Sequence, residues 1–175
     1  MDVTLVMFSG LAGTGKSTLA HAIARELKMP VVSFDYFIDH ALPRHMLTDP
    51  GNWTTQDLFE MMNKLAGQQL SLGISVILDA VYFSQAARDA VRAVANEYHA
   101  RHRVIHTLCS DKEMWRERVI ARANHASLNE TPAQWDSIMA EIDQFHPWNQ
   151  SEALFVDALH PVEKNVAAIK EYLGR

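Results

Sequence analysis

Short apolar runs alternate along this chain with longer stretches in which apolar residues recur every three or four positions. A short, continuous apolar run is typical of a strand buried in a parallel sheet, whereas recurrence at helical spacing indicates a helix with one buried face. Five runs of the first kind predict strands, at residues 3–8, 31–34, 74–79, 103–109 and 154–156.

Helical spacing follows the first run at once, at Leu19, Ala20, Ile23, Ala24 and Leu27. Hydroxyl side chains placed just before apolar periodic stretches predict the starts of three later helices. These expected caps are Thr54, Ser84 and Ser110, and the helices end near Gly73, Tyr98 and Arg122. Two more helices are expected to start at prolines. One has Pro132 at its first position, and the last is opened by Pro161 and runs to Tyr172.

Strands that alternate with helices predict an α/β fold, a parallel sheet with helices on both faces. Ligands bind such sheets beyond the carboxyl ends of the strands. The chain places residues 10–17, Asp35, Asp79, Cys109 and Asp157 at those ends. Three strands out of five thus finish on an aspartate, which predicts a polar site at this edge of the sheet.

Residues 10–17 read GLAGTGKS and match G-x-x-x-x-G-K-[ST], the phosphate-binding loop, between a predicted strand and a predicted helix. The glycines let successive backbone N–H groups converge on one anion, and the helix adds its positive N-terminal end. Lys16 is expected to reach the β- and γ-phosphates, and the Ser17 hydroxyl is expected to bind Mg²⁺. The predicted nucleotide-binding residues of this loop are Gly10, Leu11, Ala12, Gly13, Thr14, Gly15, Lys16, Ser17 and Thr18.

Composition narrows the class of protein. A chain of 175 residues, 48% apolar and 21% charged, is expected to form one domain, residues 1–175. The net charge of −5 and the lack of a dense Lys/Arg run argue against a general nucleic-acid binder. Cys109 is the only cysteine, and no stretch has the character of a leader or a membrane span, so we expect a cytoplasmic protein with no membrane partner.

The motifs of a GTP switch are missing. Guanine recognition uses N-K-x-D, but the only Asn-Lys pair, Asn63-Lys64, is followed by Leu-Ala in the middle of a predicted helix. The segment after the third strand, residues 79–82, lacks the glycine of D-x-x-G. A motor-type ATPase would usually be larger, so a small kinase fits best.

A kinase also needs groups near the acceptor and cations over the phosphates. Asp35 is the candidate that orients an acceptor hydroxyl and takes its proton. Asp79 closes an apolar run and is expected to orient the Mg²⁺ shell or to touch substrate, two roles that the sequence leaves open. Arg118 and Arg122 project from one helix face, next to a polar stretch that suggests a short lid over roughly residues 122–134.

Several of these features occur together in a known group of enzymes. The chain resembles the small P-loop kinases of the zeta-toxin, chloramphenicol-phosphotransferase and polynucleotide-kinase-like type. The resemblance rests on residues 10–18, Asp35, residues 76–80 with Arg88, residues 115–118 with 122–124, and residues 154–157. It covers nearly the whole chain, although only the phosphate-binding loop is specific by itself.

The resemblance implies a P-loop NTPase fold with strand order 2-3-1-4-5. It implies ATP with Mg²⁺ as donor and a hydroxyl as acceptor, with Asp35 as general base and Arg122 as an ATP-contacting lid arginine. The expected acceptor is a small molecule. The alternatives are a polynucleotide 5′-hydroxyl or a nucleotide sugar, and a nucleotide-binding regulator that transfers nothing.

One departure weakens the nucleic-acid alternative. Polynucleotide kinases of this type carry an arginine three residues after the aspartate, where this chain has Ile38. The surrounding apolar residues are expected either to line a pocket for a partly apolar molecule or to belong to the core; they are Phe34, Tyr36, Phe37, Ile38 and Trp53.

Overall fold

The computed structural model describes residues 3–41, 54–125 and 133–175, and its centre is a five-stranded parallel sheet. The strands are β1 (Thr4–Ser9), β2 (Val31–Ser33), β3 (Val76–Asp79), β4 (Arg101–Leu108) and β5 (Leu154–Asp157). Their order is β2-β3-β1-β4-β5, and every pairing is parallel. The order expected from the resemblance is therefore confirmed.

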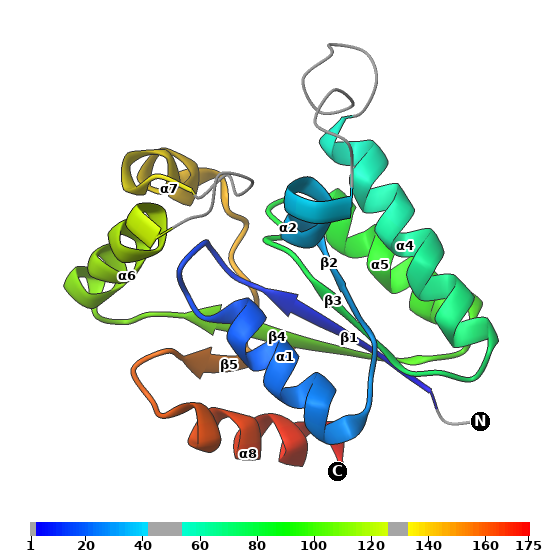
Figure 1. The fold of residues 1–175 in the computed structure, drawn as a ribbon. Helices are drawn as coiled ribbons and strands as arrows, with labels where there is room; N and C mark the ends of the chain where they lie inside the picture. The colour runs from blue at the N-terminus through cyan, green and yellow to red at the C-terminus, as the bar shows by residue number, and fades with distance from the viewer. Residues whose placement is uncertain (1–2, 42–53, 126–132) are drawn as a thin grey trace.

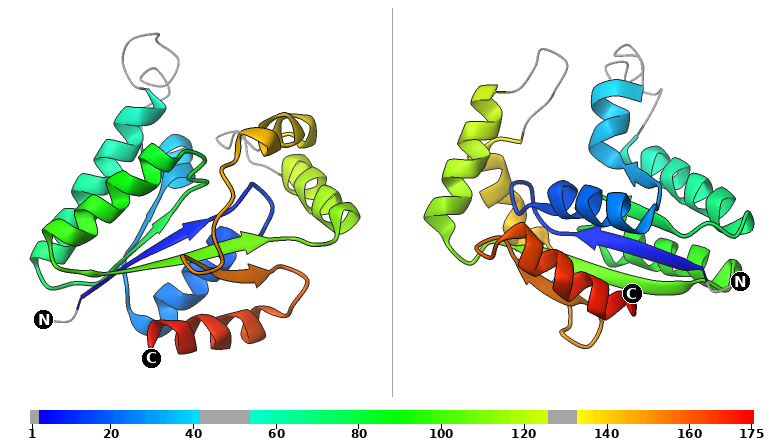
Figure 2. Two further views of the ribbon diagram at one scale, coloured as in Figure 1. Left: turned by 180° about the vertical axis from the view of Figure 1, so that it is seen from behind. Right: turned by 60° about the horizontal axis from the view of Figure 1, so that its bottom comes forward.

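Helices cover both faces of the sheet and its carboxyl end (Figure 1). The α-helices are α1 (Lys16–Leu27), α2 (Phe34–Tyr36), α4 (Thr55–Ser71), α5 (Gln85–Glu97), α6 (Lys112–His125), α7 (Trp135–Glu141) and α8 (Val162–Leu173). A π-helical segment, Phe37–Ala41, continues α2, and a 3₁₀ turn, Ile142–Gln144, continues α7. Helices α6 and α7 lie side by side beyond the sheet in each view (Figure 2).

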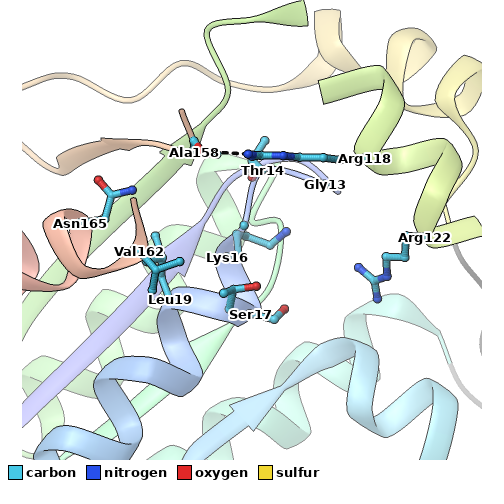
Figure 3. Close-up of a pocket in the computed structure, with 12 residues that line it drawn as sticks. Gly13, Thr14, Lys16, Ser17, Leu19, Arg118, Arg122, Ala158, Val162 and Asn165 are labelled. Carbon is cyan, nitrogen blue, oxygen red and sulfur yellow. Dashed lines mark hydrogen bonds between the residues drawn. The ribbon is translucent and has the colours of Figure 1, made fainter. Parts of the chain in front are cut away.

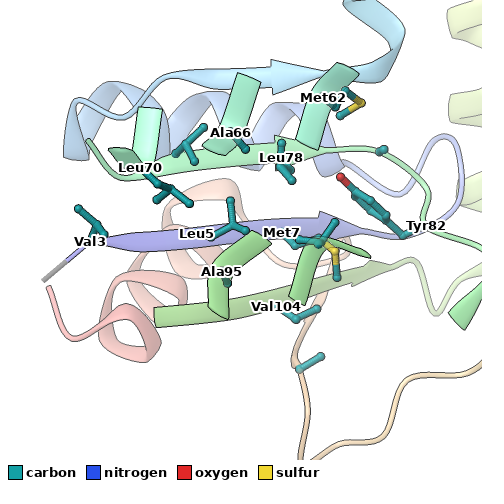
Figure 4. Packing of buried hydrophobic residues seen from close by; sticks show 14 of the residues in the cluster. Val3, Leu5, Met7, Met62, Ala66, Leu70, Leu78, Tyr82, Ala95 and Val104 are labelled. Atoms are coloured by element: carbon teal, nitrogen blue, oxygen red, sulfur yellow. The ribbon is translucent and has the colours of Figure 1, made fainter. Parts of the chain in front are cut away.

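The central strand β1 shows why this sheet needs two layers of helices. Alternate residues of a strand point to opposite faces. Leu5 and Met7 pack into the cluster beneath α4 and α5 (Figure 4). Val6 and Phe8 pack into the cluster beneath α1 and α8. All four side chains are fully buried. Burial on both faces explains the continuous apolar run from which the strand was predicted.

Two of the three predicted hydroxyl caps are confirmed. Thr54 accepts a hydrogen bond from the Asp57 N–H in a full capping box, and Ser84 accepts one from the Ala87 N–H. The prediction for Ser110 is wrong by one residue. Asp111 lies at the start of α6 and accepts a hydrogen bond from the Met114 N–H at 2.9 Å, because a carboxylate here reaches the free N–H groups of the first turn.

The proline predictions fare differently. Pro161 opens α8 as expected, as its N-cap residue. The predicted start at Pro132, and most of the suggested lid, lie outside the described residues; α7 begins at Trp135. Among the residues that the structure describes, no helix is both long and apolar enough to cross a membrane.

The second strand is shorter than predicted, which moves Asp35. Strand β2 ends at Ser33, and Asp35 lies in the first turn of α2 rather than at a strand end. The aromatic residues around it divide between core and surface. Phe34 and Phe37 pack against the core below α4, whereas the side chain of Tyr36 is 61% exposed.

Candidate active site

The phosphate-binding loop joins β1 to α1, and two of its glycines are required by close contacts. Gly10 has φ 139°, and a Cβ atom there would lie 2.3 Å from the Thr107 carbonyl oxygen on β4. Gly13 has φ 80°, and its Cβ would lie 2.5 Å from a methyl carbon of Val119 on α6. A side chain at either position would push the loop away from its supports.

Hydroxyl groups fix the loop from below. The Thr14 hydroxyl donates to the Leu11 carbonyl oxygen at 2.7 Å and lies 2.7 Å from the Thr107 hydroxyl. The Leu11 side chain is buried against α6 and α7. Leu11 and Ala12 thus serve the loop through their carbonyl groups, whereas residues 13–18 border the cavity above it.

Lys16 is a buried ammonium group, only 8% exposed. Its Nζ donates to the Leu11 carbonyl oxygen at 3.2 Å. Burial lowers the pKa of this lysine, and the negative charges of Asp79 and then Asp35 oppose the shift. A neighbouring phosphate would oppose it further, since an anion favours the charged form.

Asp79 ends β3 and is only 2% exposed. Neither carboxylate oxygen has a hydrogen-bond partner among the described residues. Burial raises the pKa of this carboxyl, with Lys16 and then the Ser17 hydroxyl opposing that shift. The Ser17 hydroxyl favours the ionised form of Asp79, although the two groups do not form a regular hydrogen bond.

An unpaired buried carboxylate is costly unless something binds it. A hard divalent cation with its water ligands would supply partners for the Asp79 oxygens, and oxygen donors are what Mg²⁺ prefers. The donor set of Ser17 and Asp79 therefore fits the predicted metal.

Above the loop lies a cavity of about 300 Å³ built from three parts of the chain (Figure 3). Residues 13–19 form its floor, Arg118 and Arg122 reach in from α6, and Ala158, Val162 and Asn165 form its wall at β5 and α8. One nitrogen of the Arg118 guanidinium donates to the Ala158 carbonyl oxygen at 3.1 Å. This contact ties α6 to the opposite wall of the cavity through Arg118.

Sequence reasoning missed that wall. Asn165 is 4% exposed and its amide nitrogen donates to the Asp157 carbonyl oxygen at 2.8 Å. No motif marks these positions; the available signal was a polar residue on the apolar face of the last predicted helix.

A second cavity, of about 350 Å³, lies on the other side of the loop. Its lining residues are Ser17, His21, Val31, Ser33, Asp35, Tyr36, Asp39, His40 and Arg122. Ser17 and Arg122 border both cavities, so the two spaces meet above the start of α1. At this junction an Arg122 nitrogen lies 3.5 Å from an Asp35 carboxylate oxygen, both side chains being about half exposed (52% and 53%).

Trp115 holds α6 against the loop. Its indole N–H donates to the Ala12 carbonyl oxygen at 2.7 Å, and its ring packs beside Gly13. Arg118 and Arg122 lie one and two helical turns further along α6. The position of the two arginines therefore depends on a contact with the loop itself.

The third strand-end aspartate lies elsewhere. One Asp157 oxygen accepts hydrogen bonds from the backbone N–H groups of Ser110 and Leu159, at 3.3 and 3.0 Å. Partial burial raises the pKa of this carboxyl, but the hydrogen bonds outweigh it and lower the pKa overall. Asp157 organises the loop after β5, and it borders neither of the two cavities. The half-buried Cys109 borders neither of them.

Comparisons with known proteins find kinases among the proteins that this chain resembles. An adenylyl-sulfate kinase of Geotalea uraniireducens (strain Rf4) is 33% identical over 93 residues, which are 51% of this chain and 44% of that kinase. The chain thus aligns with less than half the length of this curated relative.

Solved structures resemble the whole fold. The Mycobacterium tuberculosis APS kinase CysC, in complex with AMPPNP and APS, matches with a TM-score of 0.66 and 17% identity, over 99% of both chains. A gluconokinase from Sinorhizobium meliloti 1021 matches with a TM-score of 0.67 and 20% identity, over 98% of this chain and 92% of the other.

The AAA_33 family, described as an AAA domain, matches residues 5–145, most of the chain. The expected likeness to small P-loop kinases is confirmed by this match and by the shared fold. The chain belongs to the AAA domain family AAA_33 and is a kinase-like P-loop protein.

Proposed function

We propose that this protein is an ATP-dependent kinase that transfers the γ-phosphoryl group to a hydroxyl group of a small molecule, and that residues 1–175 act as one catalytic domain. The observation that carries the proposal is the meeting of two cavities at Ser17 and Arg122. One cavity has the lining of a triphosphate site, and the other contains a carboxylate suited to a hydroxyl.

In this proposal ATP lies in the first cavity, with its phosphates on the loop N–H groups and on Lys16. Mg²⁺, held through Ser17 and Asp79, would offset charge on the phosphate oxygens. Arg118 and Arg122 stabilise the negative charge that develops on the transferred group. The Mycobacterium tuberculosis APS kinase CysC, which has a similar fold, was solved in complex with both AMPPNP and APS, and this supports a site for a nucleotide beside a second molecule.

Asp35 orients the acceptor hydroxyl in the second cavity. As the acceptor oxygen bonds to the γ-phosphorus, the bond from that phosphorus to the bridging oxygen breaks, ADP leaves and Asp35 takes the hydroxyl proton. The ion pair between Asp35 and Arg122 does not obstruct this role. An exposed pair of this kind contributes roughly 0–1 kcal/mol, so the approach of substrate can separate it.

The test uses purified protein, ATP with Mg²⁺ and a metabolite extract, with mass spectrometry to find species that gain one phosphate. We expect phosphorylated product with the wild type and a loss of at least about hundredfold with Asp35→Asn, since a general base contributes 10²–10⁴-fold. Asp143→Asn, an exposed change outside both cavities, is the matched control and keeps full activity.

The two alternative functions predict different results in this assay. A polynucleotide kinase would phosphorylate 5′-hydroxyl oligonucleotides in preference to any metabolite. A nucleotide-binding regulator would bind ATP and transfer nothing, and Asp35→Asn would then change no product. Either result would reject the proposed activity.

A further inference from the structure

Tyr82 has a backbone conformation that a residue of its kind rarely adopts. Its φ is 54°, in the left-handed region, where a bulky side chain is a genuine outlier. Among the described residues, Lys28 and His99 share this feature, but both lie at the ends of helices, where left-handed residues are common. Tyr82 instead lies between β3 and α5, three residues after Asp79. Strained residues are concentrated at functional sites, so this conformation points to a role for Tyr82.

A buried arginine holds the strained segment. Arg88 on α5 is 1% exposed, and its Nε donates to the Tyr82 carbonyl oxygen at 3.0 Å. A second guanidinium nitrogen donates to the His146 carbonyl oxygen, and the guanidinium stacks on the Trp148 ring at 4.0 Å. The Trp148 indole N–H in turn donates to the Ser9 hydroxyl at 3.0 Å, at the end of β1. These contacts can maintain a conformation that is unfavourable by itself.

The side chain that this backbone positions is completely buried. Tyr82 is 0% exposed, and its ring packs against Phe59 with centroids 5.2 Å apart. The hydroxyl end of the ring points back toward β3, the strand that ends at Asp79 (Figure 4). The hydroxyl has no hydrogen-bond partner among the described residues, although a buried tyrosine hydroxyl usually has one.

The Tyr82 hydroxyl and the Asp79 carboxylate are complementary groups in the same buried region. Burial, and then the negative charge of Asp79, raise the pKa of the Tyr82 hydroxyl, so the two groups are within electrostatic range of each other. The hydroxyl is a hydrogen-bond donor and the carboxylate oxygens are acceptors. Within the described chain neither group has another hydrogen-bond partner. A contact between them would reduce the cost of burying both.

We propose that Tyr82 is a positioning residue for Asp79: in the metal-loaded site its hydroxyl donates to one carboxylate oxygen and leaves the other to face the Mg²⁺ shell. The inference rests on the Mg²⁺–ATP site proposed above and adds the group that orients its carboxylate. Residues behind a metal ligand fix its orientation in this way, and their loss typically weakens metal binding 10–100-fold. Tyr82 borders neither of the two cavities, so its effect passes through Asp79.

The experiment measures nucleotide binding with and without the metal, so it does not depend on phosphoryl transfer. AMPPNP is titrated into the full chain by calorimetry, once in EDTA and once in saturating Mg²⁺. The Tyr82→Phe variant loses only the hydroxyl. We expect the Kd for AMPPNP in Mg²⁺ to rise by about tenfold or more, and the Kd in EDTA to stay within about twofold of the wild type. An unchanged Kd in Mg²⁺ would overturn the inference.

Stability separates positioning from a structural role. We expect Tyr82→Phe to leave the free energy of unfolding of the nucleotide-free protein equal or higher, because a buried hydroxyl without a partner is unfavourable. Lower stability, or weaker binding in EDTA as well, would assign the hydroxyl to the fold instead. Tyr98→Phe is the matched control, since it removes the hydroxyl of a half-buried tyrosine at the other end of α5, outside both cavities. It should keep both wild-type Kd values.

A double variant tests whether Tyr82 acts through Asp79. Asp79→Asn should weaken binding in Mg²⁺ at least as much as Tyr82→Phe does. The double variant should then bind no more weakly than Asp79→Asn alone, because the hydroxyl has no ionised carboxylate left to orient. Additive losses would show that Tyr82 acts independently of Asp79, which contradicts the proposed role.

The outcomes also separate this inference from the proposed function. If Mg²⁺ does not tighten AMPPNP binding in the wild type and Asp79→Asn changes nothing, the proposed metal site is wrong and the role of Tyr82 is rejected with it. If Mg²⁺ tightens binding equally in the wild type and in Tyr82→Phe, the metal site stands and only the role of Tyr82 is rejected.

Discussion

Two strand-end aspartates show how the same residue type is used in opposite ways. Asp79 is buried, and neither oxygen is hydrogen-bonded within the described chain, whereas Asp157 accepts two backbone hydrogen bonds. Burial raises the pKa of Asp79, so its ionised form reduces the stability of the folded state at pH 7. Hydrogen bonds lower the pKa of Asp157 despite its partial burial, so its ionised form adds stability.

We therefore predict opposite effects on stability from the same substitution. In the absence of nucleotide, Asp79→Asn should raise the free energy of unfolding at pH 7, and Asp157→Asn should lower it. Urea unfolding of both variants beside the wild type measures this. Because Asp79 also belongs to the proposed metal site, its variant should gain stability while losing ATP turnover, a trade-off typical of active-site residues. Loss of stability in both variants would contradict the assignment.

His106 makes stability depend on pH. Burial, with Arg88 and Lys16 nearby, lowers the pKa of this imidazole to about 4. Its ring lies between those of Phe145 and Phe155, at centroid distances of 5.4 and 5.2 Å. Between pH 6.5 and 4.5 the unfolded chain binds a proton at this residue and the folded chain largely does not, so stability falls as the pH falls.

The expected loss from His106 alone is about 2 kcal/mol over that window, because one pKa unit corresponds to about 1.4 kcal/mol. His106→Phe should remove this part of the pH dependence. The measurement is the free energy of unfolding of both proteins at pH 6.5 and 4.5. An equal slope for variant and wild type would show that His106 is protonated in the folded protein.

At the scale of elements, α6 and the phosphate loop behave as one unit. Trp115 donates to the Ala12 carbonyl oxygen, and Val119 packs beside Gly13, so the helix that carries both arginines is fixed to the loop. Small displacements of catalytic groups cost large factors in rate. The contact therefore matters more for activity than for stability.

Trp115→Phe tests this coupling. It keeps an aromatic ring and removes one hydrogen bond, which is worth about 1 kcal/mol of stability. We expect kcat to fall by more than about tenfold, which is a larger effect than the loss of one hydrogen bond would produce by itself. Trp135→Phe is the control, because Trp135 packs against Trp115 from α7 at a centroid distance of 5.2 Å. Similar kinetics for both variants would count against the coupling.

Element types were easier to predict than element ends. Short apolar runs located each strand, but β2 ends before Asp35. Phe34 instead begins a helical turn and packs against Phe59, with ring centroids 5.1 Å apart. No local sequence pattern predicts this contact, because Phe59 lies in a different helix. Arg88 is a similar case, since a charged residue on a predicted helix is 1% exposed and stacks on Trp148 at 4.0 Å.

At the scale of the whole molecule, the loop motif predicted one side of the site, whereas the other sides depend on the order of the strands in the sheet. Strand β1 lies between β3 and β4, which brings the loop beside Asp79 and Thr107. The wall formed by Ala158, Val162 and Asn165 comes from the far end of the chain and has no motif. Its position depends on β5 joining β4 at the sheet edge, which no short sequence pattern encodes.

A nucleotide should therefore stabilise the entire fold. The lining of its cavity comes from three distant parts of the chain, which are residues 13–19, Arg118 with Arg122, and residues 158–165. A ligand that binds only the folded state adds about 2.7 kcal/mol of stability at a hundredfold excess over its Kd. ATP with Mg²⁺ should raise the unfolding midpoint accordingly in the wild type.

Lys16→Met should abolish most of that gain, because it removes the buried cation expected to face the phosphates. It should leave the stability of the nucleotide-free protein equal or higher, since burial disfavours the charged lysine. Lys164→Met, an exposed change on α8 outside the cavity lining, is the matched control and should keep the full nucleotide effect. Equal stabilisation of both variants by ATP would place the nucleotide elsewhere on the molecule, and the catalytic roles assigned around the loop would then fail with it.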